Sequence, residues 1–168
     1  LPGARAFAAG LPYPRFYLDF ETVGPAIPIW AGTRPYQTLP FQWSCQIERT
    51  PALSPALLDP TEFLDLSGGP PMRALAEALI RTLEDVGPVL MYTSYERGVI
   101  EGLAAMYPDL ATPLQALVER LVDLHPVTRA NYYHPDMLGS WSIKAVLPTI
   151  APDMDYATLE GIREGTEA

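Results

Sequence analysis

Asp19 and Glu21 are two acids separated by one residue within an apolar and aromatic segment at 15–23, RFYLDFETV. Its composition predicts a buried strand, on which residues two apart point to the same face. Two carboxylates on one face repel each other and lose hydration unless a cation lies between them. Hard oxygen ligands suit Mg²⁺ or Mn²⁺, so the pattern predicts a divalent-metal site. The alternative is that the strand ends at Asp19 and that both acids are solvated or cap backbone groups.

Two further acids follow apolar segments. Glu96 comes just after a strand predicted at 88–93 and opens a helix predicted at 95–107, so it is a third candidate ligand. Acids are also common in the first helical turn because they complement the helix dipole, which is the alternative explanation. Asp123 closes an apolar helical pattern, and it is either a secondary member of the site or a residue of a helix end or turn.

Other residue types that support catalysis are scarce. His125 and His134 are the two histidines, and each precedes a proline, which predicts loop positions and structural roles. Cys45 is the single cysteine, so we expect neither an internal disulfide nor a thiol cluster for zinc. Its place in a predicted strand indicates a small buried hydrophobic residue.

The composition is that of a packed globule, because 48% of the 168 residues are hydrophobic and 18% are charged. This length fits one domain at 1–168. With 11 Lys and Arg against 20 Asp and Glu, the net charge of −9 disfavours a protein that coats nucleic acid. No apolar run approaches the roughly 18 residues of a membrane-spanning helix, so we expect a cytoplasmic protein without a membrane partner. A start at Leu1 without an apolar leader indicates a fragment of a longer protein.

The elements that position these acids follow from apolar periodicity. Strands are predicted at 15–23, 41–48, 56–65 and 88–93, with a short one near Asp123. Helices are predicted at 72–83, 95–107, 114–122 and 142–147. Four prolines in 24–40 disfavour a helix or a central strand there. Strands first and helix–strand–helix afterwards predict a mixed α/β domain with one sheet, which opens as an antiparallel meander.

Aromatic and basic residues on polar loops are candidates for contacts with a nucleic acid. The aromatic side chains that could stack on unpaired bases are Trp30, Tyr36, Tyr132, Tyr133 and Trp141. The basic side chains that could hold phosphates are Arg34, Arg129 and Lys144, of which Lys144 is the only lysine. The alternative is that the aromatic rings anchor long loops to the protein surface.

Several segments resemble known families. YLDFET, starting at Tyr17, resembles the first motif of the DEDD exonuclease superfamily, a branch of the ribonuclease H-like fold. LMYTSYERGVIEGL at 90–103 is similar to its second motif. The segments GTRPYQTLPFQWS, YYHPDMLGSWSIKAVLP and GTEA resemble an uncharacterised bacterial group, domain-of-unknown-function family 2779. Together these resemblances extend over about residues 15–168.

The resemblance implies a set of metal ligands. Asp19 and Glu21 match the ligands of the first motif, and Glu96 stands where the second motif usually has an aspartate. Glu167 matches the fourth acid, with Glu164 as a competitor. The fold implied is ribonuclease H-like, with a mixed sheet flanked by helices. The activity implied is 3′ to 5′ hydrolysis of single-stranded DNA or RNA by two Mg²⁺ or Mn²⁺ ions.

The resemblance also implies substrate contacts and partners. Tyr92 stands where the second motif usually has an asparagine, and it joins Arg34, Lys144 and Trp141 as a substrate-binding candidate. Ile162 and Arg163 occupy the positions of the usual His or Tyr base. The base is therefore unassigned, with His134 or a loop tyrosine as substitutes. A second nuclease-like domain in the full-length chain is the expected partner. The competing interpretation is an inactive ribonuclease H-like module that binds nucleic acid or a protein.

Overall fold

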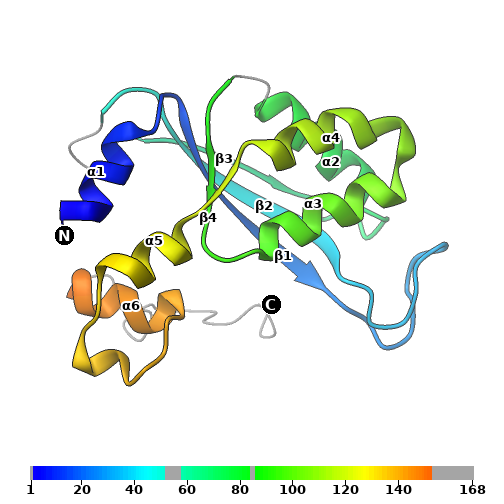
Figure 1. Ribbon diagram of the computed structural model, residues 1–168. Coiled ribbons are helices and arrows are strands. Elements are labelled where there is room, and N and C mark those ends of the chain that lie inside the picture. The colour runs from blue at the N-terminus through cyan, green and yellow to red at the C-terminus, as the bar shows by residue number, and fades with distance from the viewer. Residues whose placement is uncertain (1, 52–57, 84–85, 153–168) are drawn as a thin grey trace. The chain divides into compact units, whose positions relative to one another are not determined.

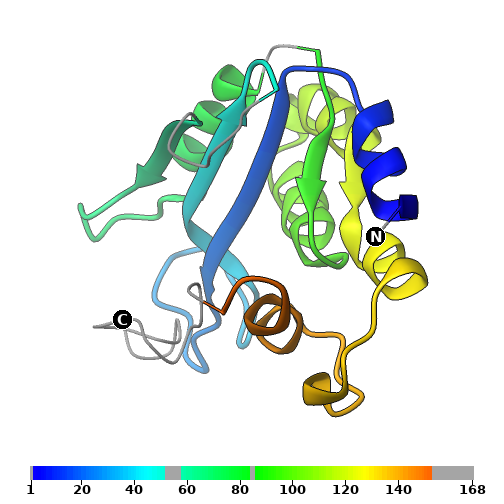
Figure 2. The same ribbon diagram turned by 90° about the vertical axis from the view of Figure 1, so that its left-hand side faces the viewer.

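A five-stranded sheet in the order β3-β2-β1-β4-β5 forms the centre of the computed structural model, which describes residues 2–51, 58–83 and 86–152 (Figures 1 and 2). The strands are β1 (Arg15–Val23), β2 (Leu39–Glu48), β3 (Asp59–Leu64), β4 (Val89–Met91) and β5 (Leu121–Asp123). The first three strands pair antiparallel in chain order, whereas β4 pairs parallel with both β1 and β5. The predicted mixed α/β class and the antiparallel opening are confirmed.

The start of β2 differs from the prediction. The strand begins at Leu39 and contains Pro40, within the proline-rich segment where we expected no central strand. Pro40 lies opposite Thr22 of β1, whereas pairing with β3 begins only at Gln42. At Pro40, β2 therefore has a neighbour on one side only. A residue without a backbone N–H is tolerated there.

Three helices cover one face of the sheet. They are α2 (Met72–Thr82), α3 (Tyr95–Met106) and α4 (Ala111–Glu119), joined in part by a 3₁₀ turn at Pro108–Leu110. Helix α2 packs on β2 and β3, α3 packs on β1, and α4 packs on α2 and α3. The apolar stripes that predicted these helices are the faces that they bury.

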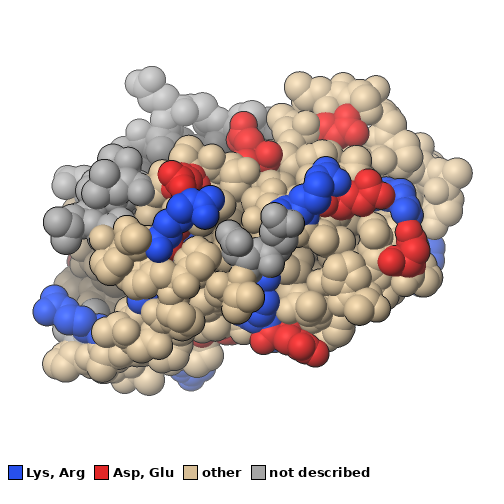
Figure 3. Space-filling view, turned by 90° about the horizontal axis from the view of Figure 1, so that it is seen from above, with Lys and Arg blue, Asp and Glu red and all other residues tan. Residues whose placement is uncertain are grey.

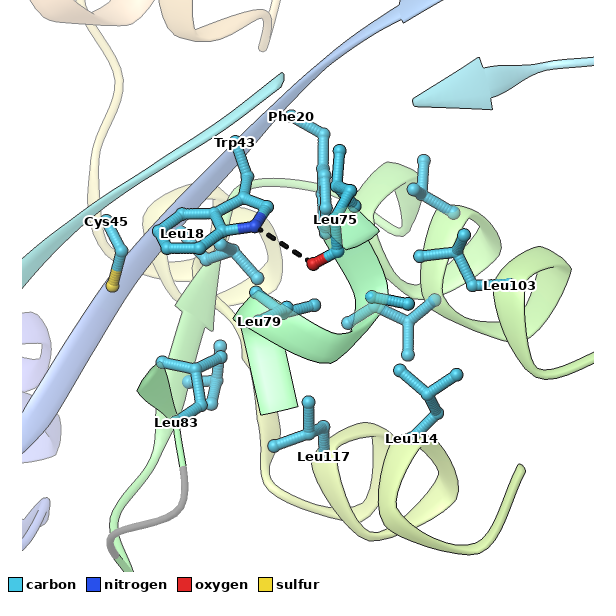
Figure 4. Close-up of a cluster of buried hydrophobic side chains, with 14 of the residues drawn as sticks. Leu18, Phe20, Trp43, Cys45, Leu75, Leu79, Leu83, Leu103, Leu114 and Leu117 are labelled. Carbon is cyan, nitrogen blue, oxygen red and sulfur yellow. Dashed lines mark hydrogen bonds between the residues drawn. The ribbon is translucent and has the colours of Figure 1, made fainter. Parts of the chain in front are cut away.

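The core lies between these helices and the sheet (Figure 4). Alternate residues of β1, namely Phe16, Leu18 and Phe20, are buried, whereas Asp19 and Glu21 are exposed. The Trp43 indole of β2 donates a hydrogen bond to the Leu75 carbonyl of α2, 3.3 Å away. The core therefore joins the strand that carries the paired acids to the helical layer.

The end of helix α4 corrects one prediction. The apolar pattern predicted a helix over 114–122, but α4 ends at Glu119, and Leu121 and Val122 belong to β5. Both residues fit a helical stripe, yet they pair with Val89 and Leu90 of β4. A short apolar run is compatible with either structure, and here the neighbouring strand decides between them.

Close backbone approach brings β4 beside β1. A Cβ atom at Gly87 would lie 2.0 Å from the carbonyl oxygen of Pro14, so only glycine fits there without a shift. The Phe16 N–H donates to the carbonyl of Pro88 at 3.1 Å, which begins the pairing of the two strands. Gly87 thus permits the parallel neighbour that leads into α3.

The contacts divide the chain into two compact units, 11–123 and a second formed by 1–10 with 124–168. In the second unit, α1 (Pro2–Gly10) packs on α5 (Leu124–Asn131), and α6 (Ile143–Ile150) packs on a 3₁₀ turn at Pro135–Met137. The loop prediction holds for His134 and is wrong for His125, which lies in α5. None of the helices in the described residues is long and apolar enough to span a membrane.

We expect Leu75→Ala to lower the free energy of unfolding by about 2–5 kcal/mol, because Leu75 is completely buried and truncation leaves a cavity. Urea denaturation followed by circular dichroism measures this change. Leu66→Ala is the control, since Leu66 is 85% exposed and its truncation should change stability little. Equal losses for the two variants would contradict the described core.

Candidate metal centre

Acidic side chains gather at one edge of the sheet. Strands β1, β4 and β5 run parallel, so their carboxyl ends meet at the same edge. β1 carries Asp19 and Glu21 toward this end, β5 finishes with Asp123, and β4 leads into α3, which carries Glu96. The carboxyl edge of parallel strands is the usual place for ligand sites in open α/β sheets.

Asp19 and Glu21 lie on the face of β1 opposite the helical core, as the strand period predicted. They pair with Ser44 and Gln42 of β2, and the register shifts between Glu21 and Thr22. Such irregularities redirect a strand and are frequent beside functional sites. The Asp19 side chain keeps contact with solvent, but neighbouring protein atoms limit its hydration. This desolvation raises the pKa of Asp19, against the lowering effect of a hydrogen bond from the Phe20 backbone.

Glu96 is the buried acid of the group, with 6% of its surface exposed. Its Oε2 atom is buried and has no hydrogen-bond partner within the described ranges 2–51, 58–83 and 86–152. Burial is the main cause that raises the pKa of Glu96 to about 7, and the negative charges of Asp19 and Asp123 contribute to this rise, against the lowering effect of a hydrogen bond from its own backbone. An acid that only complements a helix dipole would be expected to face solvent. The burial of Glu96 therefore needs a different explanation.

A side-chain contact ties the end of β1 to the start of α3. The hydroxyl groups of Thr22 and Tyr95 share a hydrogen bond across 73 positions of the sequence. Tyr95 is the first residue of α3, and Glu96 follows it directly. This contact therefore holds the first turn of the helix beside the strand that carries Asp19.

Asp123 contacts the turn between β4 and α3. Its Oδ1 atom accepts a hydrogen bond from the backbone N–H of Thr93 at 3.0 Å. Thr93 has a positive φ of 79°, in the left-handed region that β-branched residues rarely adopt. The sequence singled out Asp123 but not Thr93, because nothing in the residue types around Thr93 predicts a left-handed backbone.

Several acids elsewhere on this unit have basic partners. Arg49 lies 2.8 Å from Asp59, and Arg73 lies 3.0 Å from Glu77 and also pairs with Asp109. On the face seen in Figure 3, acidic and basic side chains are interspersed. Exposed pairs of this kind contribute little to stability. Their partners nevertheless distinguish them from Glu96, whose neighbouring charges are both negative.

The remaining predicted site residues are distributed over both units. Tyr92 follows β4 and is half-buried, and Arg34 lies between β1 and β2, where its backbone N–H donates to Gln37. The residues in the second unit are Lys144, Trp141 and His134. Glu164 and Glu167 lie outside the described residues, as do Ile162 and Arg163. Of the predicted site residues, Asp19 and Asp123 lie near enough to Glu96 for their negative charges to act on its carboxyl group.

Several aromatic candidates have structural contacts. The Trp30 indole donates to the Gly68 carbonyl at 3.3 Å, and the Tyr132 hydroxyl lies 2.9 Å from the Thr149 hydroxyl. The rings of Tyr133 and Trp141 lie 6.2 Å apart. These contacts favour the interpretation that the rings anchor loops.

The chemistry of the donor set fits a hard divalent cation. All the candidate donors are carboxylate oxygens, and one of them is buried with no hydrogen-bond partner among the residues that the structure describes. Within residues 2–51, 58–83 and 86–152, no three His, Cys, Asp or Glu side chains lie in an arrangement ready to hold a metal ion. Binding would therefore draw the carboxylates closer together than they lie here.

Comparison with known proteins gives one match. The model of the family described as a domain of unknown function, DUF2779, matches residues 16–142 and confirms the resemblance to that group. The matched range includes Asp19, Glu21, Glu96 and Asp123, and it ends just before Lys144. No curated protein and no solved structure gives a significant match.

We expect Glu96→Gln to raise the melting temperature at pH 8 and to leave it nearly unchanged at pH 5. The pKa of Glu96 in the folded protein, about 7, lies above the ordinary value of 4.5, so folding favours the protonated form. The stabilisation of the folded state that comes from this preference is complete below pH 4.5 and is lost as the pH rises through 7. Thermal melting at a series of pH values measures the difference.

Glu101→Gln is the matched control, because Glu101 lies on the exposed side of the same helix, 3.8 Å from Arg97. Its melting temperature should follow that of the parent at every pH. A Glu96→Gln variant with the same pH profile as the parent would show that Glu96 titrates normally.

Proposed function

This chain belongs to the DUF2779 family, and we propose that it is a divalent-metal-dependent phosphodiester hydrolase with a ribonuclease H-like fold. The observation that carries the proposal is the buried Oε2 atom of Glu96, which has no hydrogen-bond partner in the part of the chain that the structure describes and lies beside two further negative charges. A buried carboxyl group of this kind either stays protonated or, when it is ionised, needs a compensating cation. The mixed sheet with helices on one face is compatible with the fold that the resemblance implies.

Asp19, Glu21 and Glu96 would hold Mg²⁺ or Mn²⁺, with Glu167 as the proposed fourth ligand. When bound, a pair of such ions lowers the pKa of an attacking water and stabilises the leaving oxygen of a phosphodiester. Glu96 must lose its proton to act as a ligand, so metal binding should release a proton and weaken below about pH 7. Asp19 and Glu21 are exposed and can approach a substrate phosphate from the solvent side.

The proposed substrate is the end of a single-stranded DNA or RNA, degraded in the 3′ to 5′ direction. The exposure of Tyr36 favours a single-stranded nucleic acid as the substrate, because this residue is 76% exposed in the connection that follows β1. Exposed aromatic rings stack on unpaired bases of any sequence. Arg34 lies two residues before it and can contact phosphate. We also propose that the full-length protein contains a second nuclease-like domain.

Metal binding should be visible in thermal melting. Mn²⁺ at about 100 times its dissociation constant stabilises the folded state by about 2.7 kcal/mol, which raises the melting temperature by about 5–10 °C at this chain length. Asp19→Asn should abolish this rise. It should also stabilise the metal-free protein at pH 8, because burial raises the pKa of Asp19 and disfavours its charge.

Asp59→Asn is the control, since Asp59 lies on the edge strand β3 with an exposed side chain paired to Arg49. It should keep the response of the parent to Mn²⁺. A parent protein whose melting temperature does not change with Mn²⁺ would refute the proposed metal site.

Activity on end-labelled single-stranded DNA and RNA oligonucleotides tests the hydrolysis. We expect products with Mg²⁺ or Mn²⁺, none with EDTA, and a loss of at least about 100-fold in Asp19→Asn or Glu96→Gln, because each removes a metal ligand. Labels at either end distinguish the direction of degradation. Binding of Mn²⁺ without cleavage of any substrate would favour an inactive module that binds nucleic acid or a protein.

A further inference from the structure

Thr93 adopts a backbone conformation that its side chain disfavours. Its φ of 79° lies in the left-handed region, where the branched Cβ of threonine crowds the backbone. Residues in such conformations persist only when neighbouring structure holds them, and they are concentrated at functional sites. Thr93 lies between β4 and α3, three positions before Glu96. Something must therefore hold this turn in place.

Asp123 supplies that restraint. Met91, the last residue of β4, pairs with Asp123 of β5 in parallel register. Thr93, two residues after Met91, contacts Asp123 a second time, since its N–H donates to the Asp123 Oδ1 atom at 3.0 Å. Backbone pairing and a side-chain hydrogen bond thus anchor the exit of β4 to the end of β5 at two successive points.

The restraint lies at the base of α3. Ser94, which precedes the helix, makes no side-chain capping hydrogen bond. The Thr22–Tyr95 contact holds the first turn from the side of β1, and the Asp123–Thr93 contact holds it from the side of β5. Because Glu96 is buried and lies three positions after Thr93, a rotation about Thr93 would move its carboxylate out of its buried place.

We propose that Asp123 is a positioning residue that fixes Glu96 by holding Thr93 in the left-handed conformation. The inference depends on the proposed metal-binding function only for its metal readout. Asp123 acts here through a hydrogen bond to the backbone, not as a ligand. An asparagine at 123 retains an oxygen that accepts the Thr93 N–H, whereas an alanine does not.

The test is a double-mutant cycle in the full chain, with Mn²⁺ affinity measured by calorimetry. Asp123→Ala should weaken Mn²⁺ binding by about tenfold or more, since the strain at Thr93 then drives the turn away. Asp123→Asn should stay within about threefold of the parent, because it keeps the acceptor. Adding Thr93→Gly to Asp123→Ala should restore most of the affinity, because glycine adopts a positive φ without steric cost.

Thr93→Ala is the matched control. It removes the branch but keeps a Cβ atom, so in the Asp123→Ala background it should restore less affinity than Thr93→Gly. A loss in Asp123→Asn as large as in Asp123→Ala would show that the charge matters, and would overturn the positioning role. Failure of Thr93→Gly to recover affinity in the Asp123→Ala background would overturn it as well.

The same cycle measured in EDTA separates this inference from the proposed function. Asp123→Ala should lower the melting temperature of the metal-free protein, and Thr93→Gly should raise it less in that variant than in the parent, because the turn has already relaxed there. If the effects of the two substitutions on the melting temperature in EDTA were additive, the restraint would be refuted, irrespective of their effects on Mn²⁺ affinity. A parent that binds no Mn²⁺ would refute the proposed function, and the cycle in EDTA would still decide the role of Asp123.

Discussion

The burial of the Glu96 carboxyl group, beside the negative charges of Asp19 and Asp123, is the constraint on which the rest of the structure depends. Parallel pairing of β1, β4 and β5 brings the segments that carry them to one edge of the sheet. Glu96 is buried there, with one oxygen that has no hydrogen-bond partner among the described residues. Its pKa rises to about 7 because burial and both neighbours disfavour its charge. Such an arrangement opposes folding, so packing elsewhere must stabilise it.

The stabilising structure lies on the opposite face of the same strand. Phe16, Leu18 and Phe20 alternate with the exposed acids and pack against the helical layer. Gly87 lets β4 approach β1 closely, and contacts of Thr22 and Asp123 hold the start of α3 from two sides. A rigid edge of this kind places a carboxylate more accurately than a flexible loop does.

These acids lie in the part of the chain that matches the model of the DUF2779 family, which covers residues 16–142. The four acids Asp19, Glu21, Glu96 and Asp123 all belong to the unit 11–123. Lys144 and Trp141 belong to the other unit, and their part in substrate binding stays a prediction. The four acids of the proposed metal site therefore lie in one unit and offer oxygen donors alone.

Local patterns in the sequence determined the strand at 15–23, helices α2 and α3, and the choice of Asp19, Glu21 and Glu96, because apolar periodicity and residue type are local properties. They did not determine where α4 ends, since Leu121 and Val122 fit a helix or a strand until β4 pairs with them. The burial of Glu96 and the left-handed Thr93 depend on contacts between segments 30 and 73 positions apart. Only the tertiary structure decided these features, because they exist only once distant strands lie side by side.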